Sequence, residues 1–217
     1  MYKNYQNKSV IQKLLFSPFI INKSHAKKIA YIAITSAILI VANVFEVPFI
    51  DAQYSLTIAT SAIAGVLLGP ISGFASCMVA DAIGFLINSK GGIYMPWVGL
   101  AVAVTALMAG LIYHFINFKF KGGSIVKLVL ICLASFTLGT ILINSTGFYF
   151  YNYYMGFSTT VIDYVAKTFG TNVTYIAYVI YRLFFKGLIF SCLVNYALIL
   201  IVTPIIVNVP LFKKDLE

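Results

Sequence analysis

The sequence has few charged residues. Asp, Glu, Lys and Arg make up only 10% of its 217 residues, whereas 61% are hydrophobic. A soluble domain of this length has too little interior to bury so much apolar surface. The composition therefore predicts an all-α integral membrane protein with a single membrane domain.

Motifs of nucleotide-binding and hydrolytic enzymes are also missing. The chain has no P-loop, no GxSxG, no HExxH and no pair of acids at helical spacing. Cys77, Cys132 and Cys192 lie in apolar segments without metal-site spacing, so we expect buried free thiols. His25 and His114 stand alone at the ends of apolar runs, where a solvated or capping role is expected. We predict that the protein is not an enzyme, needs no cofactor and binds no metal.

Six apolar runs predict six transmembrane helices. They cover residues 29–45, 56–68, 71–87, 97–115, 128–143 and 175–207. Gly69 and Pro70 separate the second run from the third and predict a sharp reversal of the chain. Residues 1–28 form a basic segment that lies on the membrane face or binds a partner, and 208–217 form a basic tail.

The lysines are distributed unevenly around these runs. Six precede the first run, three lie between the fourth and the fifth, and two close the chain, whereas only Lys90 and Lys167 fall in the other loops. By the positive-inside rule, both termini are cytoplasmic. The net charge of +9 thus reports topology in the lipid bilayer and indicates no nucleic acid partner. The loops around residues 48–53, 88–96 and 148–174 then share the outer face, which predicts an outward-facing ligand pocket beneath them.

Two cations lie inside the last apolar run. Arg182, the only arginine, and Lys186 are four residues apart, which places them on one face of a helix. An ionisable residue within a membrane span costs at least about 2.5–3.5 kcal/mol, so it usually faces the protein interior and has a function. The pair predicts a site for an anionic or carbonyl-bearing group. The structural alternative is that both snorkel to one interface or pair with acids.

Further candidates lie near the ends of other runs. Asp81, embedded in the third run, is a counter-ion, a polar anchor or a protonated structural group. Tyr94 and Trp97 either belong to an interfacial aromatic belt or stack on a flat ligand. Asn144 follows the fifth run. It precedes the tyrosine-rich segment 148–174, which predicts a loop or lid with a short amphipathic helix after Ser158.

Small residues form a stripe along the first run. Ala26, Ala30, Ala33 and Ala37 recur at three- and four-residue intervals, so another helix can approach this face closely. The stripe either packs inside the chain or docks a separate subunit.

Several segments resemble the S-components of energy-coupling factor (ECF) vitamin transporters, most closely the folate-type family. The matches are AGVLLGP (64–70), ADAIGF (80–85), GIYMP (92–96), GLIY (110–113) and the pattern of Arg182 and Lys186. They occur in the family's order and extend over about half of the chain.

This resemblance implies a protein of the cell membrane that binds a water-soluble vitamin from outside. The partners would be a transmembrane T-component and two cytoplasmic ATPase subunits. In the family an alanine face on the first helix docks the T-component, and Ala33 and Ala37 match it. Folate-type members often carry an arginine where this chain has Asn43, which is followed by Glu46 and Asp51. Folate is the expected vitamin by family proximity, with pantothenate or another vitamin as the alternative.

Two other classes of function remain open from the sequence. One is an independent ion-coupled secondary transporter with Asp81 as the coupling acid. The other is a structural subunit whose cations contact lipid headgroups. The candidate substrate-binding residues are Arg182, Lys186, Tyr94, Trp97, Asn144, Asp81 and Asn43.

Overall fold

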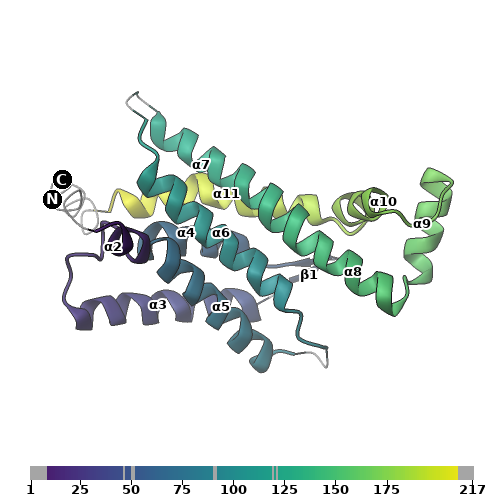
Figure 1. Cartoon of the computed structure of the whole chain (residues 1–217), viewed down its shortest axis with the longest axis horizontal. Coiled ribbons are helices and arrows are strands. Elements are labelled where there is room, and N and C mark those ends of the chain that lie inside the picture. Colours follow the sequence, from purple (N-terminus) through teal and green to yellow (C-terminus); the bar gives the residue numbers. More distant parts are fainter. Residues whose placement is uncertain are drawn as a thin grey trace.

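The computed structural model describes residues 9–45, 47–49, 52–89, 92–118, 120 and 122–209. Predictions that rest on Glu46, Asp51, Lys90 and most of the basic tail concern positions outside these ranges. The described chain forms an elongated helical bundle (Figure 1).

The bundle is built from helices, with one short hairpin. In chain order the elements are α2 (Val10–Leu15), α3 (His25–Val44), β1 (Val47–Phe49), β2 (Ala52–Tyr54), α4 (Thr57–Leu68), α5 (Pro70–Ile87), α6 (Pro96–Phe115), α7 (Gly123–Ala134), η1 (Ser135–Ser145), α8 (Thr146–Met155), α9 (Thr159–Phe169), α10 (Tyr175–Ile180), η2 (Tyr181–Phe185) and α11 (Leu188–Val207). Strands β1 and β2 pair in antiparallel fashion, and η1 and η2 are π-helical.

The predicted membrane class is confirmed. Within the described residues, five helical segments are long and apolar enough to span a membrane: α3, α5, α6, the continuous segment Gly123–Met155, and α11. Helix α4 and the segment Tyr175–Phe185 are apolar but shorter. The count of six spans and the orientation of the chain stay predictions.

The predicted reversal at Gly69 and Pro70 is also confirmed. Gly69 has a φ of 109°, which favours glycine, and Pro70 begins α5, where its missing N–H costs nothing. Close to this turn α4 and α6 approach each other very closely. A Cβ atom on Gly65 would lie 1.9 Å from the carbonyl oxygen of Ala106, so only glycine fits there.

The predicted end of the fifth helix is wrong. We expected a loop after residue 147, but the helix continues through η1 and α8 to Met155. No glycine or proline interrupts residues 148–155, and the helix ends at Gly156, which has a φ of 95°. Tyr149 of α8 is held by packing, since its ring centroid lies 5.4 Å from that of Tyr175 and 5.7 Å from that of Tyr178.

The last apolar run is not one helix either. It is broken after η2, where Lys186 leaves the helix and Gly187 has a φ of 65° before α11 begins. We expected one span over residues 175–207, although the hydrophobicity of this run falls at Arg182 and Lys186, just before the break. The break places Arg182 on a π-helical turn and Lys186 just beyond it.

The N-terminal segment is only partly a surface element. Val10 and Ile11 on α2 are exposed, but Phe19 and Ile20 are each 1% exposed and belong to the core with Leu68. The hydroxyl of Ser17 donates a hydrogen bond to the carbonyl oxygen of Leu67. This segment therefore covers the end of the bundle at which α4 turns into α5, contrary to an arrangement wholly on the membrane face.

The buried His114 completes the same end of the bundle. Its Nε2 lies 2.7 Å from the carbonyl oxygen of Val66, so the ring caps the last turn of α4. The three cysteines are buried and free, as predicted.

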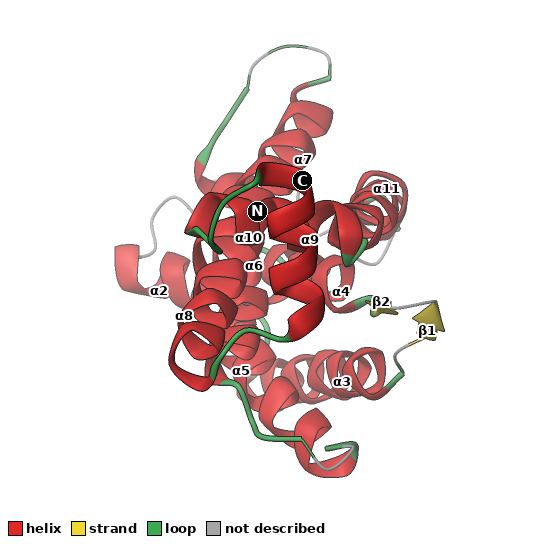
Figure 2. Cartoon of the chain, turned by 90° about the vertical axis from the view of Figure 1, so that its right-hand side faces the viewer, coloured by secondary structure: helices red, strands yellow, loops and turns green. Residues whose placement is uncertain are grey.

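Helix α9 marks the opposite end of the molecule. It runs across the bundle at the end far from Ser9 and Val209, the first and last described residues, and it faces the viewer when the bundle is seen end-on (Figures 1 and 2). Its existence after Ser158 is confirmed. Val161 and Val165 of α9 are buried against Tyr178 and Tyr181, so this helix is packed onto the end of the bundle.

Candidate functional site

A cavity of about 600 Å³ lies in the half of the bundle covered by α9. Its walls come from the start of α4, from α6, from η1 and α8, and from η2 and the start of α11, while Ser158 and Val161 close it from α9. Its volume falls within the range of cavities that hold small organic ligands. Arg182, Lys186 and Asn144 all line it.

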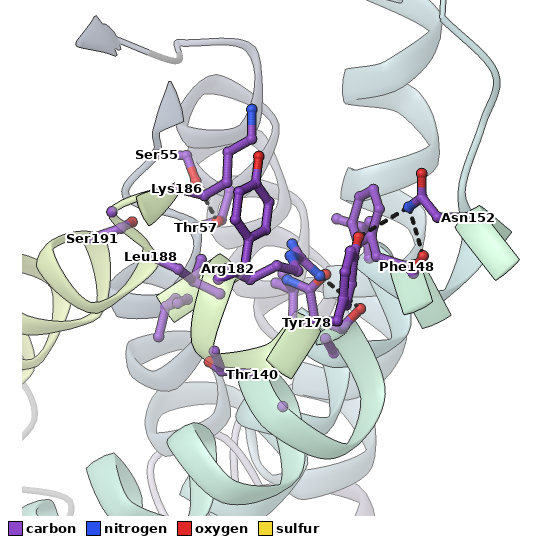
Figure 3. A pocket seen from close by; sticks show the side chains of 18 of the residues that line it. Ser55, Thr57, Thr140, Phe148, Asn152, Tyr178, Arg182, Lys186, Leu188 and Ser191 are labelled. Atoms are coloured by element: carbon purple, nitrogen blue, oxygen red, sulfur yellow. Dashed lines mark hydrogen bonds between the residues drawn. The ribbon is translucent and has the colours of Figure 1, made fainter. Parts of the chain in front are cut away.

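Arg182 is fixed in this cavity by two contacts. Its Nη1 donates to the backbone carbonyl oxygen of Asn144 at 3.1 Å, and its guanidinium carbon lies 4.1 Å from the centroid of the Phe148 ring. Among the described residues, no carboxylate forms an ion pair with Arg182. A guanidinium has five N–H donors, so most of them remain available to a ligand. Figure 3 shows Arg182 beside Tyr178 and Phe148.

Two walls of the cavity are π-helical. Asn144 lies on η1 and Arg182 lies on η2. The wider turn of η1 is supported by Ser145, whose hydroxyl donates to the carbonyl oxygen of Thr140 at 2.9 Å. Such turns occur often at functional sites, because the extra residue re-aims neighbouring side chains.

Lys186 lines the same cavity but is exposed, since it follows the last turn of η2. Within the described part of the chain its amino group makes no ion pair. The two cations therefore line one cavity without stacking on a single helical face.

Asn144 contributes an acceptor to this cavity. Its backbone oxygen is bonded to Arg182, whereas its side-chain Oδ1 is buried without a hydrogen-bond partner among the described residues. Buried polar atoms are normally paired, so an unpaired acceptor at a cavity wall indicates a place for a donor from a ligand or from water.

Two further polar residues support the cavity and were missed from the sequence. Asn152 donates to the hydroxyl of Tyr178 at 2.9 Å and to the carbonyl oxygen of Phe148 at 2.7 Å (Figure 3). Asn152 stands among several tyrosines in a stretch that was interpreted as a loop, so it was not recognised as a residue of the site.

Asn195 holds α11 against the start of α4. It is 1% exposed, its Oδ1 accepts from the backbone N–H of Ala59 at 2.9 Å, and its Nδ2 donates to the carbonyl oxygens of Ser55 and Ser191 at 2.9 and 2.8 Å. Ser55 and Ser191 both line the cavity. An asparagine inside a long apolar run was the available signal in the sequence.

A second cavity, of about 240 Å³, holds three of the predicted residues: Asn43, Asp81 and Tyr94. Asp81 is 8% exposed. Its Oδ1 accepts a hydrogen bond from Asn43 Nδ2 and its Oδ2 accepts one from the Tyr94 hydroxyl, each at 3.1 Å. Burial and the neighbouring Asp81 raise the pKa of Tyr94, so this phenol stays a neutral donor at physiological pH.

Trp97 lines neither cavity. Its ring lies 5.9 Å from those of Phe148 and Tyr151, and it packs directly on Gly147. Its Nε1 is buried without a hydrogen-bond partner among the described residues. Trp97 therefore contacts Phe148, which lines both cavities, without lining either of them itself. Tyr94 lines the smaller cavity, whereas Arg182 lines the larger one.

The alanine stripe of α3 is exposed along its length. Ala26, Ala30, Ala33 and Ala37 all have exposed side chains, and so do the neighbouring Ile34 and Ile38. Of the two alternatives open from the sequence, packing inside the chain is therefore not observed.

An apolar helical bundle with a polar, cationic cavity near one end is a membrane protein built to bind a small molecule. The model of the family described as ECF transporter, substrate-specific component, matches residues 27–207, and the chain belongs to this family. A search of curated proteins gave no match. Members are substrate-binding membrane proteins of transport systems and not enzymes, so the chain is a multi-pass protein of the cell membrane.

Proposed function

We propose that the chain captures a water-soluble vitamin, with folate favoured over pantothenate, for import by a shared ATP-driven module. The observation that carries this proposal is Arg182, which faces a cavity of ligand size without a carboxylate partner among the described residues. An arginine desolvated at such a place is stabilised by a bound anion, and its fork suits a carboxylate. Lys186 at the same cavity adds a second positive charge.

Aromatic side chains on the cavity wall support a ligand with a flat ring. Phe148, Tyr178 and Tyr181 line it together with Arg182. Rings at these positions offer stacking partners in offset or edge-to-face geometry. This feature favours folate, whereas pantothenate has no ring to stack.

We place the cavity on the outer side of the membrane, with both termini inside. The lysine distribution supports this orientation, and the described ends of the chain lie at the end of the bundle opposite α9 (Figure 1). Helix α9 would then cover the cavity from outside. Labelling of a Ser158→Cys variant, at the exposed start of α9 on the cavity wall, tests this lid: we expect saturating vitamin to slow modification, and an unchanged rate contradicts closure.

The T-component and two ATPase subunits are the proposed partners, as family membership implies. The exposed small-residue face at Ala33 and Ala37 supports docking of the T-component on α3, because small side chains let helix backbones approach closely. The sequence has no ATP-binding motif, and under this proposal the energy comes from these partners.

Reconstituted uptake tests this assignment against an ion-coupled transporter. Vesicles with the chain, the T-component and both ATPases should accumulate labelled vitamin only with ATP, and vesicles with the chain alone should not. Uptake by the chain alone, driven by a proton gradient and lost in Asp81→Asn, would instead establish the ion-coupled alternative.

A further inference from the structure

Helix α4 begins at the wall of the larger cavity without a cap of its own. Its N-cap position is Leu56, which offers no side-chain acceptor to the free N–H groups of the first turn. The N–H of Ala59 instead donates to Oδ1 of Asn195, 136 residues further along the chain, at 2.9 Å. A side chain of α11 therefore supplies the cap that the local sequence of α4 lacks.

The amide of Asn195 satisfies its neighbours in only one orientation. Its Nδ2 donates to the carbonyl oxygen of Ser55 at 2.9 Å and to that of Ser191 at 2.8 Å, so both of its N–H groups are used. Reversal of the amide would turn its NH2 group toward the N–H of Ala59 and its oxygen toward two carbonyl oxygens. All three hydrogen bonds would be lost, which is costly because Asn195 is only 1% exposed.

The partners of this amide belong to two walls of the larger cavity. Ser55 and Ser191 line the cavity, and so does Thr57, whose hydroxyl oxygen lies 2.8 Å from that of Ser55 (Figure 3). Ser55 and Thr57 lie at the start of α4, whereas Ser191 belongs to the first turn of α11. Asn195 does not line the cavity itself. It joins the two walls from within the bundle.

Both walls are helix ends, which open more easily than helix interiors unless a contact holds them. The start of α11 is separated from η2 by Gly187, which has a φ of 65°, so no continuous helix supports it. The start of α4 follows the short strand β2, which ends at Tyr54. The hydrogen bonds of Asn195 therefore fix the separation of two segments that would otherwise be held loosely.

We infer that Asn195 is a positioning residue for the ligand: it sets the separation of the α4 and α11 walls of the larger cavity and thereby the affinity. This inference rests on the proposed function. A cavity whose walls are held in place before the ligand arrives loses less conformational freedom on binding, and so it binds more tightly. A role in stability alone would leave the affinity of the folded chain unchanged.

The test compares two variants of Asn195 with a control at a buried apolar position. Asn195→Leu keeps a side chain of similar size and removes all three hydrogen bonds, and Asn195→Ala removes them without adding apolar bulk. The control is Ile199→Ala, since Ile199 lies one turn further along α11, is 0% exposed and lines neither cavity. Calorimetric titration of the detergent-purified full chain with folate and with pantothenate measures the affinities.

We expect both Asn195 variants to weaken the binding of the probe that the wild type binds by about tenfold or more, because the walls are no longer preorganised. Ile199→Ala should also lower the unfolding temperature, since it leaves a hole in the core, but should keep the affinity within about twofold of the wild type. Wild-type affinity in a folded Asn195 variant overturns the inference. So does an equal loss of affinity in the control, which would trace the effect to stability.

Hydrogen–deuterium exchange tests the same contact without any variant. The N–H of Ala59 should exchange slowly in the ligand-free wild type, and more slowly still with saturating probe. Rapid exchange at Ala59, or a rate that the bound probe leaves unchanged, overturns the inference even if no Asn195 variant folds. The proposed function fails differently, because it is refuted by a folded wild type that binds neither probe.

Discussion

Replacement of Arg182 by glutamine is the sharpest test of the larger cavity. The change removes the charge and most of the donors, and the shorter side chain also loses the bond from Nη1 to the carbonyl oxygen of Asn144. A hydrogen bond between charged partners contributes about 1.5–3 kcal/mol, and about 1.4 kcal/mol corresponds to tenfold in affinity. We therefore expect Arg182→Gln to weaken vitamin binding by about 10- to 100-fold.

Lysine at the same position separates charge from geometry. Arg182→Lys keeps the positive charge but loses the planar fork that binds a carboxylate with two parallel bonds. We expect its affinity to lie between those of the wild type and Arg182→Gln. Lys167→Gln is the control, because Lys167 is an exposed cation on α9 that lines neither cavity.

The stability of the Arg182 variants has to be measured together with their binding. Arg182 also bonds to the backbone of η1, so its loss leaves the carbonyl oxygen of Asn144 without its donor, at a cost of about 1–3 kcal/mol. Thermal unfolding of each ligand-free variant measures this cost. An Arg182→Gln variant that is folded and binds folate and pantothenate as the wild type does would refute the role of Arg182.

Three further variants test helix packing and the docking face on α3. Asn195→Leu should destabilise the chain by at least about 2 kcal/mol, because the N–H of Ala59 and the carbonyl oxygen of Ser55 lose their partner, and unchanged thermal unfolding would contradict this. Gly65→Val should lower the unfolding temperature strongly, since its side chain would collide with the backbone of Ala106; a stable variant would show that α4 and α6 can separate freely. Ala37→Leu should abolish co-purification with the T-component while vitamin binding persists, and retained assembly would argue against docking on this face.

The structural features that could be predicted depend on local residue preferences and on composition. The turn at Gly69 and Pro70 follows from the backbone preferences of two residues, and the membrane class follows from long apolar runs. The break at Gly187 was not predictable in this way, because a single glycine in an apolar run more often marks close packing than a helix end. The extension of the fifth helix to Met155 depends on contacts of Tyr149 with distant tyrosines, which local sequence does not show.

Several residues of the candidate site could be predicted from the sequence, but their arrangement in space could not. An arginine and an aspartate inside apolar runs are conspicuous, and each lines a cavity in the structure. Their separation into two cavities depends on how α5, α6 and α8 pack. Phe148 lines both cavities, but nothing in the sequence distinguished it from the neighbouring aromatic residues. Trp97 was singled out as a lone tryptophan, whereas its place behind Phe148 is a tertiary feature.

Vitamin capture by this chain is tested most directly by a binding screen of the purified chain alone against the water-soluble vitamins. Thermal unfolding is the readout of binding. A ligand that binds the folded state raises its apparent stability by about 2.7 kcal/mol at a concentration of 100 times its Kd. We expect a clear shift with one vitamin, folate first, and the loss of that shift in Arg182→Gln. A folded chain that shows no shift with any vitamin would contradict vitamin capture by this protein.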